Sequence, residues 1–93
     1  MQHKTYKDIP NLLRKYRKIS GLKQKEVANI LGLKSTSRIS RWEKGMSIPN
    51  FITILKLSVL YRTLIDSLFI DHLRELRKEI REKEQQFYHK KHS

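Results

Sequence analysis

The stretch LKQKEVANILGLKSTSRISRWEKGMSIP, residues 22–49, carries the clearest helical pattern in this chain. Its apolar residues recur at helical spacing in two short segments, which predict one helix over 24–31 and a second over 36–44. Gly32 and Gly45 follow the two segments, where a glycine ends a helix at the lowest cost. Helices of about two turns are not stable alone in water, so both must pack on the rest of the chain.

The second of these segments divides into an apolar and a polar face. Ile39 and Trp42, at i and i+3, are its expected buried pair, which makes Trp42 a core residue rather than a stacking platform for bases. The opposite face is rich in hydroxyls and basic groups. Such a face on a pair of short helices is typical of a helix-turn-helix unit that reads DNA. The candidate contacts in this segment are Lys34, Ser35, Thr36, Ser37, Arg38 and Arg41.

The charge of the chain supports a polyanionic partner. The 93 residues make one small domain with room for an appendage, and they carry a net charge of +12. The first fifty residues hold twelve lysines and arginines against three acids, so the basic excess surrounds the two predicted helices. A basic surface is the expected footprint of a nucleic-acid-binding protein, although charge alone also fits a generic basic protein.

Several classes of protein are not expected from the composition. The absence of cysteine excludes disulfides and thiolate metal sites and fits an intracellular compartment. The histidines are scattered and Glu43 lacks a partner acid, so we expect no metal, no cofactor and no enzymatic activity. No apolar run is long enough to span a membrane, and the N-terminus lacks the apolar segment of a secretory signal. We therefore expect a cytoplasmic protein.

Three further helices are predicted around the central pair. The first runs to Ile19, with Asp8 as its cap and Pro10 in its first turn. The fourth covers Phe51–Leu60 after the cap Asn50, and it is apolar nearly all round, which predicts a core helix. A fifth begins near residue 63.

From Phe69 onward the pattern changes. Apolar residues follow one another at alternating steps of four and three, which is a heptad seam with charges between. The seam fits either a dimer contact or an extension folded back on the domain, and we favour a dimer contact through Phe69, Leu73, Leu76 and Ile80. We expect a DNA-binding domain over 8–70, a C-terminal amphipathic helix over 71–88 and a disordered basic tail over 89–93.

The whole pattern resembles the phage repressor and Cro-like helix-turn-helix domains, also called the xenobiotic-response-element family. The likeness covers roughly residues 10–70. It rests on Gln24, on Val27-Ala28, on the block ISRWEKG at 39–45 and on the following Pro49. The resemblance implies an all-α, five-helix lambda-repressor-like domain, here with a C-terminal helical extension.

The resemblance also implies roles for single residues. The third helix would lie in the major groove, with Thr36, Ser37 and Arg41 facing bases. Gln24 would clamp the DNA backbone, and Lys44 would meet a phosphate. Arg17 and Glu43 would form a buried ion pair between the first and third helices.

Two positions depart from the family pattern. Gly32 and Ile39 are seven steps apart, where family members usually have six, so the turn is one residue longer. Lys23 stands where a capping side chain is usual, which leaves the first N–H groups of the second helix to water or to a phosphate.

Taken together, these features predict a homodimeric, sequence-specific double-stranded DNA-binding regulator of transcription, without a small-molecule effector. The sequence leaves open whether it is a repressor or an activator. Two alternatives stay open. One is an antitoxin-type protein that binds DNA and also a partner protein. The other is a non-specific nucleic-acid-binding protein.

Overall fold

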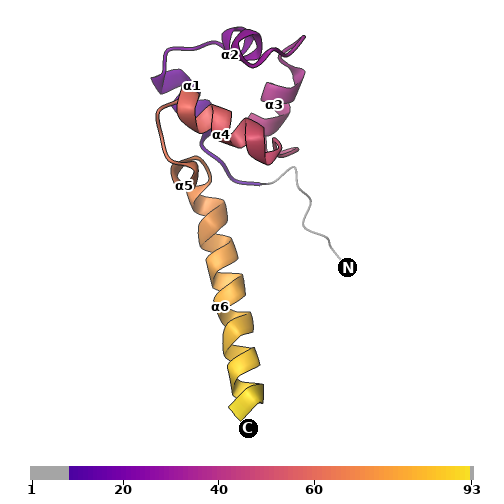
Figure 1. Ribbon diagram of the computed structural model, residues 1–93, viewed down its shortest axis with the longest axis vertical. Helices are drawn as coiled ribbons and strands as arrows, with labels where there is room; N and C mark the ends of the chain where they lie inside the picture. Colours follow the sequence, from indigo (N-terminus) through magenta and orange to yellow (C-terminus); the bar gives the residue numbers. More distant parts are fainter. Residues whose placement is uncertain (1–8, 93) are drawn as a thin grey trace.

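The computed structural model describes residues 9–92, and every regular element in that range is an α-helix, which confirms the predicted all-α class. Helices α1 to α5 gather into a compact unit, here called the head (residues 9–69), from which α6 projects as one long helix (Figure 1). The helices are α1 (Leu13–Ile19), α2 (Gln24–Leu31), α3 (Ser37–Glu43), α4 (Phe51–Leu60), α5 (Ile65–Leu68) and α6 (Ile70–His92).

A single apolar core joins the five helices of the head. Complete burial of a large apolar side chain stabilises a fold by about 1.5–3 kcal/mol, so even a core of this size can hold short helices together. Each helix of the head contributes to it. The buried members are Leu13, Val27, Ala28, Ile39, Trp42, Leu57, Tyr61, Leu68 and Phe69.

The expected helix ends of the central pair are present. Gly32 ends α2 in the left-handed conformation, with φ of 75°, and its N–H donates to Asn29 at 3.1 Å. Gly45, also at φ of 75°, follows α3. A residue with a Cβ is strained at such angles, which explains the glycines.

Helix α1 begins later than the sequence predicts. Its first residue is Leu13, whose N–H donates to Asn11 Oδ1 at 3.0 Å, and the N-cap position is held by Leu12, which makes no side-chain capping bond. The preceding N–H, of Leu12, donates to the carbonyl of Leu68 in α5 at 2.8 Å instead of starting the helix earlier. Ile19, the last residue of α1, is 67% exposed. The predicted cap Asp8 lies outside the described residues.

Helix α4 has the predicted bounds and cap but not the predicted burial. Asn50 Oδ1 accepts from the Thr53 N–H at 2.9 Å. Of its ten residues only Leu57 is fully buried, and Ile52 and Val59 are 58% and 77% exposed. The prediction of a core helix was wrong because the head packs against one side of α4 and leaves the other uncovered.

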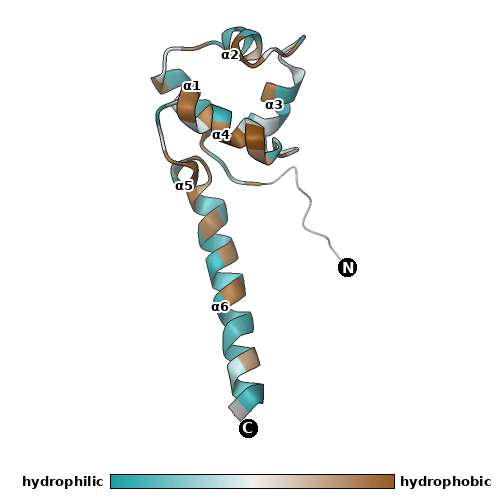
Figure 2. Cartoon of the chain, viewed as in Figure 1, coloured by the Kyte–Doolittle hydropathy of each residue, from teal (hydrophilic) through white to brown (hydrophobic). Residues whose placement is uncertain are grey.

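The C-terminal part also differs from the prediction. Phe69 is only 9% exposed and belongs to the core of the head, so it is unavailable for the predicted contact with a second copy. Helix α6 continues to His92, so residues 89–92, predicted as part of a disordered tail, extend the helix. Figure 2 shows apolar patches recurring along α6 between polar turns. Within residues 9–92, none of the helices combines the length and apolar character that a membrane crossing needs.

Candidate nucleic-acid interface

The turn before α3 absorbs its extra residue without disturbing the core. Leu33 donates its N–H to Ala28 at 2.8 Å and packs against the core, as Ile39 does from α3. Helix α3 starts at Ser37, whose N–H donates to Ser35 Oγ at 3.3 Å. The additional residue of the turn therefore lies between Leu33 and Ser37. The Ser35 side chain accepts the hydrogen bond that joins the turn to the first residue of α3.

The outer side of α3 carries a polar row. Ser37, Ser40, Arg41 and Lys44 stand at i, i+3, i+4 and i+7, which places them on one face of the helix. All are exposed except Ser40, which is half-buried. This row lies opposite the buried side of α3, so it is held outward by the core.

A buried polar cluster fixes α3 against α1. The Arg17 guanidinium contacts the Glu43 carboxylate twice, from Nε to Oε2 at 2.6 Å and from Nη2 to Oε1 at 3.1 Å. Arg17 Nη1 also donates to the Leu22 carbonyl at 2.9 Å. The side chains are only 10% and 6% exposed, and the hydrogen bond to Glu43 raises the pKa of Arg17 further above its ordinary value. A bidentate pair of this kind fixes orientation as well as charge.

The same cluster reaches α2 through Gln24. Its Nε2 donates to Glu43 Oε1 at 3.0 Å, so one carboxylate orients residues from α1 and α2 together. Gln24 is the first residue of α2 and is half-buried beside α3. As expected, the Lys23 side chain caps none of the first N–H groups of α2, while the N–H of Lys23 itself donates to Glu26 Oε1 at 2.8 Å.

A polar hollow lies where α1, α2 and α3 meet. Two of its residues, Arg14 and Ser40, were not among the sequence candidates. Arg14 stands three residues before Arg17 on α1, and this spacing, which puts both on one helix face, was the signal that could have found it. The lining residues are Arg14, Arg17, Gln24, Ser40, Glu43 and Lys44.

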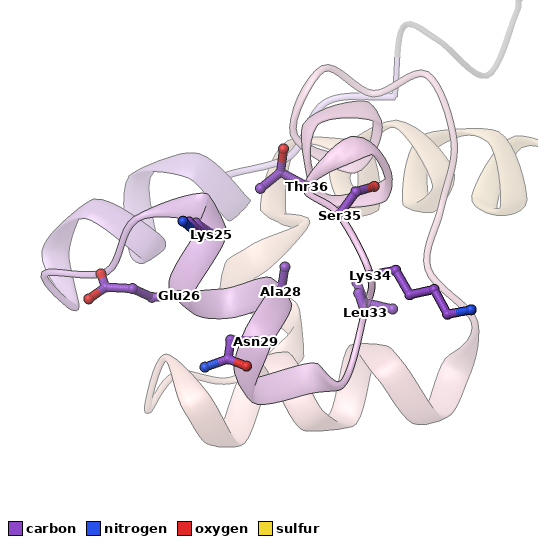
Figure 3. Close-up of a pocket in the computed structure, with 8 residues that line it drawn as sticks. All are labelled: Lys25, Glu26, Ala28, Asn29, Leu33, Lys34, Ser35 and Thr36. Carbon is purple, nitrogen blue, oxygen red and sulfur yellow. The ribbon is translucent and has the colours of Figure 1, made fainter.

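The elbow between α2 and α3 forms a second hollow (Figure 3). Lys25, Ala28 and Asn29 line it from α2, and the turn residues 33–36 line it from the other side. In the close-up the Lys34 side chain extends away from those of α2. Lys34 and Ser35 are exposed and Thr36 is half-buried, whereas Arg38 is exposed at the start of α3.

The charge of the head favours an anionic ligand over this surface. Residues 9–69 contain twelve lysines and arginines against three acids, Glu26, Glu43 and Asp66. Glu43 is paired with Arg17 inside the head. In the part of the chain that the structure describes, no three His, Cys, Asp or Glu residues are grouped to hold a metal ion. The exposed charge around α3 is consequently almost all positive.

A model of the helix-turn-helix family matches residues 13–68, more than half of the chain and nearly the whole head. The chain belongs to the helix-turn-helix family, in its phage repressor and Cro-like branch. Searches of curated proteins and of solved structures returned no match. The family assignment makes the chain a DNA-binding regulator in general terms, and it agrees with an outward, basic α3.

Proposed function

We propose that this helix-turn-helix protein is a sequence-specific regulator that binds double-stranded DNA as a homodimer and represses transcription by occupying its site. The observation that carries the proposal is the buried cluster of Arg17, Glu43 and Gln24, which holds α3 with its polar row outward. A recognition helix needs such a fixed orientation, because its side chains must meet base edges in register.

The contacts divide into two kinds in this proposal. Exposed cations at the edge of the surface, Lys34, Arg38 and Lys44, neutralise phosphates and set the register of the protein on the duplex. Thr36, Ser37 and Arg41 face the bases, with Arg41 suited to bidentate bonds with guanine O6 and N7. Gln24, held by Glu43, clamps the backbone at the start of α2.

The homodimer rests on α6. Leu76 and Ile80 are exposed and Leu73 is half-buried, and these three form the seam that remains after Phe69 is assigned to the core. Deletion of residues 74–93 is expected to weaken the dimer, which sedimentation equilibrium measures. A two-fold dimer would read half-sites about 34–36 Å apart, or a multiple of that spacing.

Selection of binding sites from a random duplex pool tests the proposal. We expect an enriched sequence with two related half-sites. A mobility-shift competition at about 150 mM salt then compares the selected duplex with a scrambled one, since low salt inflates non-specific binding. Equal competition by both duplexes would favour a non-specific nucleic-acid-binding protein and contradict the proposal.

The antitoxin-type alternative has one observation in its favour. The uncovered apolar side chains of α4, Ile52 and Val59 among them, are suited to contact another polypeptide. Isolation of a stable complex with a second, unrelated protein at defined stoichiometry would support that alternative.

A further inference from the structure

An apolar groove runs between the end of α2 and the outer side of α4. Three of its side chains are more than half exposed: Ile30 at 57%, Ile52 at 58% and Val59 at 77%. A contiguous apolar surface on a small protein usually marks an interface. The groove is lined by Ile30, Leu31, Ile52, Leu55, Lys56, Val59 and Leu60.

The chain's own C-terminal helix does not cover this groove. Helix α6 runs unbroken from Ile70 to His92, and its sequence contains neither glycine nor proline. A helix of this length extends about 34 Å at 1.5 Å per residue, and without a break it does not turn back. Figure 1 shows it leading away from the head.

Helix α6 nevertheless carries the kind of surface that a groove of this kind accepts. Leu76, Ile80 and Phe87 lie along one side of it and are exposed. Glu79 and Glu84 border this stripe on its two sides, and Lys83, paired with Glu79 at 3.2 Å, interrupts it between Ile80 and Phe87. Among the described residues the only charged side chain that lines the groove is Lys56, so an α6 seated with Glu84 on that side would bring a carboxylate towards a lysine.

Like charges disfavour the other possible arrangement, a parallel coiled coil of two α6 helices. In register, the heptad would place Lys83 opposite Lys83 of the second copy within the seam. It would also place Glu79 beside Glu84 of the second copy, and like charges at these flanking positions destabilise a coiled coil. In addition, such a pair would leave the groove of each head uncovered.

We propose that α6 of one copy docks in the α2–α4 groove of a second copy, and that the exchange is reciprocal. The inference rests on the proposed homodimer and specifies how that dimer is built. Each chain offers one groove and one apolar helix, so a two-fold pair covers both surfaces of both chains and leaves none for further copies. Binding of an amphipathic helix in an apolar groove is a common mode of recognition.

Cysteine cross-linking tests the arrangement, because the chain has no cysteine of its own. Val59→Cys and Ile80→Cys are prepared separately, mixed, and treated with a short thiol cross-linker. We expect a covalent dimer that contains one copy of each variant. Ile19→Cys replaces Val59→Cys in the control, since Ile19 is 67% exposed but does not line the groove, and it should yield no such product. Efficient linking of Ile80→Cys to itself would place α6 against α6 and overturn the proposal.

A second measurement covers variants that fail to link. Val59→Glu and Ile80→Glu should each raise the dimer dissociation constant at least about tenfold, the shift given by 1.4 kcal/mol, while Ile19→Glu leaves it unchanged. Sedimentation equilibrium supplies the constants, and circular dichroism confirms that each variant stays helical. A wild-type chain that is monomeric at the concentrations used, or an unchanged dimer in both groove and helix variants, overturns the proposal.

The outcome is separable from that of the proposed function. A dimer linked through residues 59 and 80 that selects no DNA sequence would support this arrangement and contradict the specific regulator. If instead a dimer forms that is cross-linked only between two Ile80→Cys side chains and binds DNA site-selectively, the specific regulator is supported and this arrangement is contradicted.

Discussion

A glutamate in the head and a glutamate in α6 make contacts of different kinds. In the head, Glu43 is buried and accepts hydrogen bonds from Arg17 and Gln24, which come from two other helices. In α6, Glu79 is exposed and pairs with Lys83 one turn away in the same helix, at 3.2 Å. The carboxylate in the head therefore joins distant parts of the chain, whereas the one in α6 joins neighbours within one helix.

The difference also shows in what each region needs from a partner. The head has its own core and a strong excess of positive charge for DNA. Residues 70–92 hold seven lysines and arginines against five acids, and side chains from residue 74 onward are exposed wherever they are described. A helix with a nearly balanced charge and an uncovered apolar stripe gains stability from packing rather than from propensity alone.

The largest effect is expected from Glu43→Ala. It leaves the Arg17 guanidinium buried without its carboxylate and should cost about 3–5 kcal/mol, as broken buried pairs do. Thermal or urea unfolding followed by circular dichroism measures the loss. The double variant Arg17→Met, Glu43→Leu should recover part of it, because no unpaired charge remains. If the free energy of unfolding falls by less than the loss of an exposed ion pair would cause, the buried cluster does not hold α3 in place.

Alkaline pH should weaken the head through Tyr61. Burial, and then the nearby charge of Glu43, raise the pKa of Tyr61 from 10.0 to about 12. The folded pKa lies above the unfolded one, so this stabilisation is complete below pH 10 and is lost as the pH rises towards 12. The loss is about 1.4 kcal/mol for each unit of pKa difference.

Denaturant titrations across that pH range measure the effect. Tyr61→Phe, which has no ionisable hydroxyl, should show a smaller decline than the wild type. Tyr88→Phe, a change at an exposed site in α6, serves as the matched control and should decline as the wild type does. Parallel curves for all three proteins would remove Tyr61 as a cause.

Arg41→Ala tests the proposed contact between α3 and the DNA bases. We expect it to lose about 1–3 kcal/mol of discrimination at one base position while binding to phosphates persists. Arg81→Ala removes the same charge from α6 and should leave the preferred sequence unchanged. Binding-site selection with both variants makes the comparison, and an unaltered preference in Arg41→Ala would exclude it from base readout.

The smallest effect is expected from Glu79→Ala. Exposed pairs at i and i+4 contribute about 0.3–0.5 kcal/mol, so the unfolding of the head should barely respond to the loss of Glu79. Circular dichroism of the helical signal, measured beside that of Glu43→Ala, tests this. A loss as large as that of Glu43→Ala would show that α6 and the head unfold as one unit.

Periodicity predicted the helices of this protein well because it reports which residues share a face. Ile39 and Trp42 were placed in the core from spacing alone, and the structure buries both of them. The glycines after α2 and α3 were equally informative, since few other residues adopt a positive φ.

Whether a shared face is covered depends on distant parts of the chain, which spacing does not describe. Ile52 and Val59 were expected in the core because α4 is apolar all round, but no element of the head packs on that side. Phe69 fits the heptad spacing, but in the structure its side chain packs in the core of the head. Ser40 and Arg14 became site candidates only when α1, α2 and α3 were brought together.

The hydrogen bond from the Leu12 N–H to the Leu68 carbonyl, 2.8 Å long, joins the segment before α1 to the end of α5. Counted from Leu12, the two ends of the head therefore lie side by side. A unit with adjacent ends can be inserted into a surface loop of another protein without stretching its host, and it tolerates circular permutation. The head, counted from Leu12, therefore meets this geometric condition for insertion into another protein.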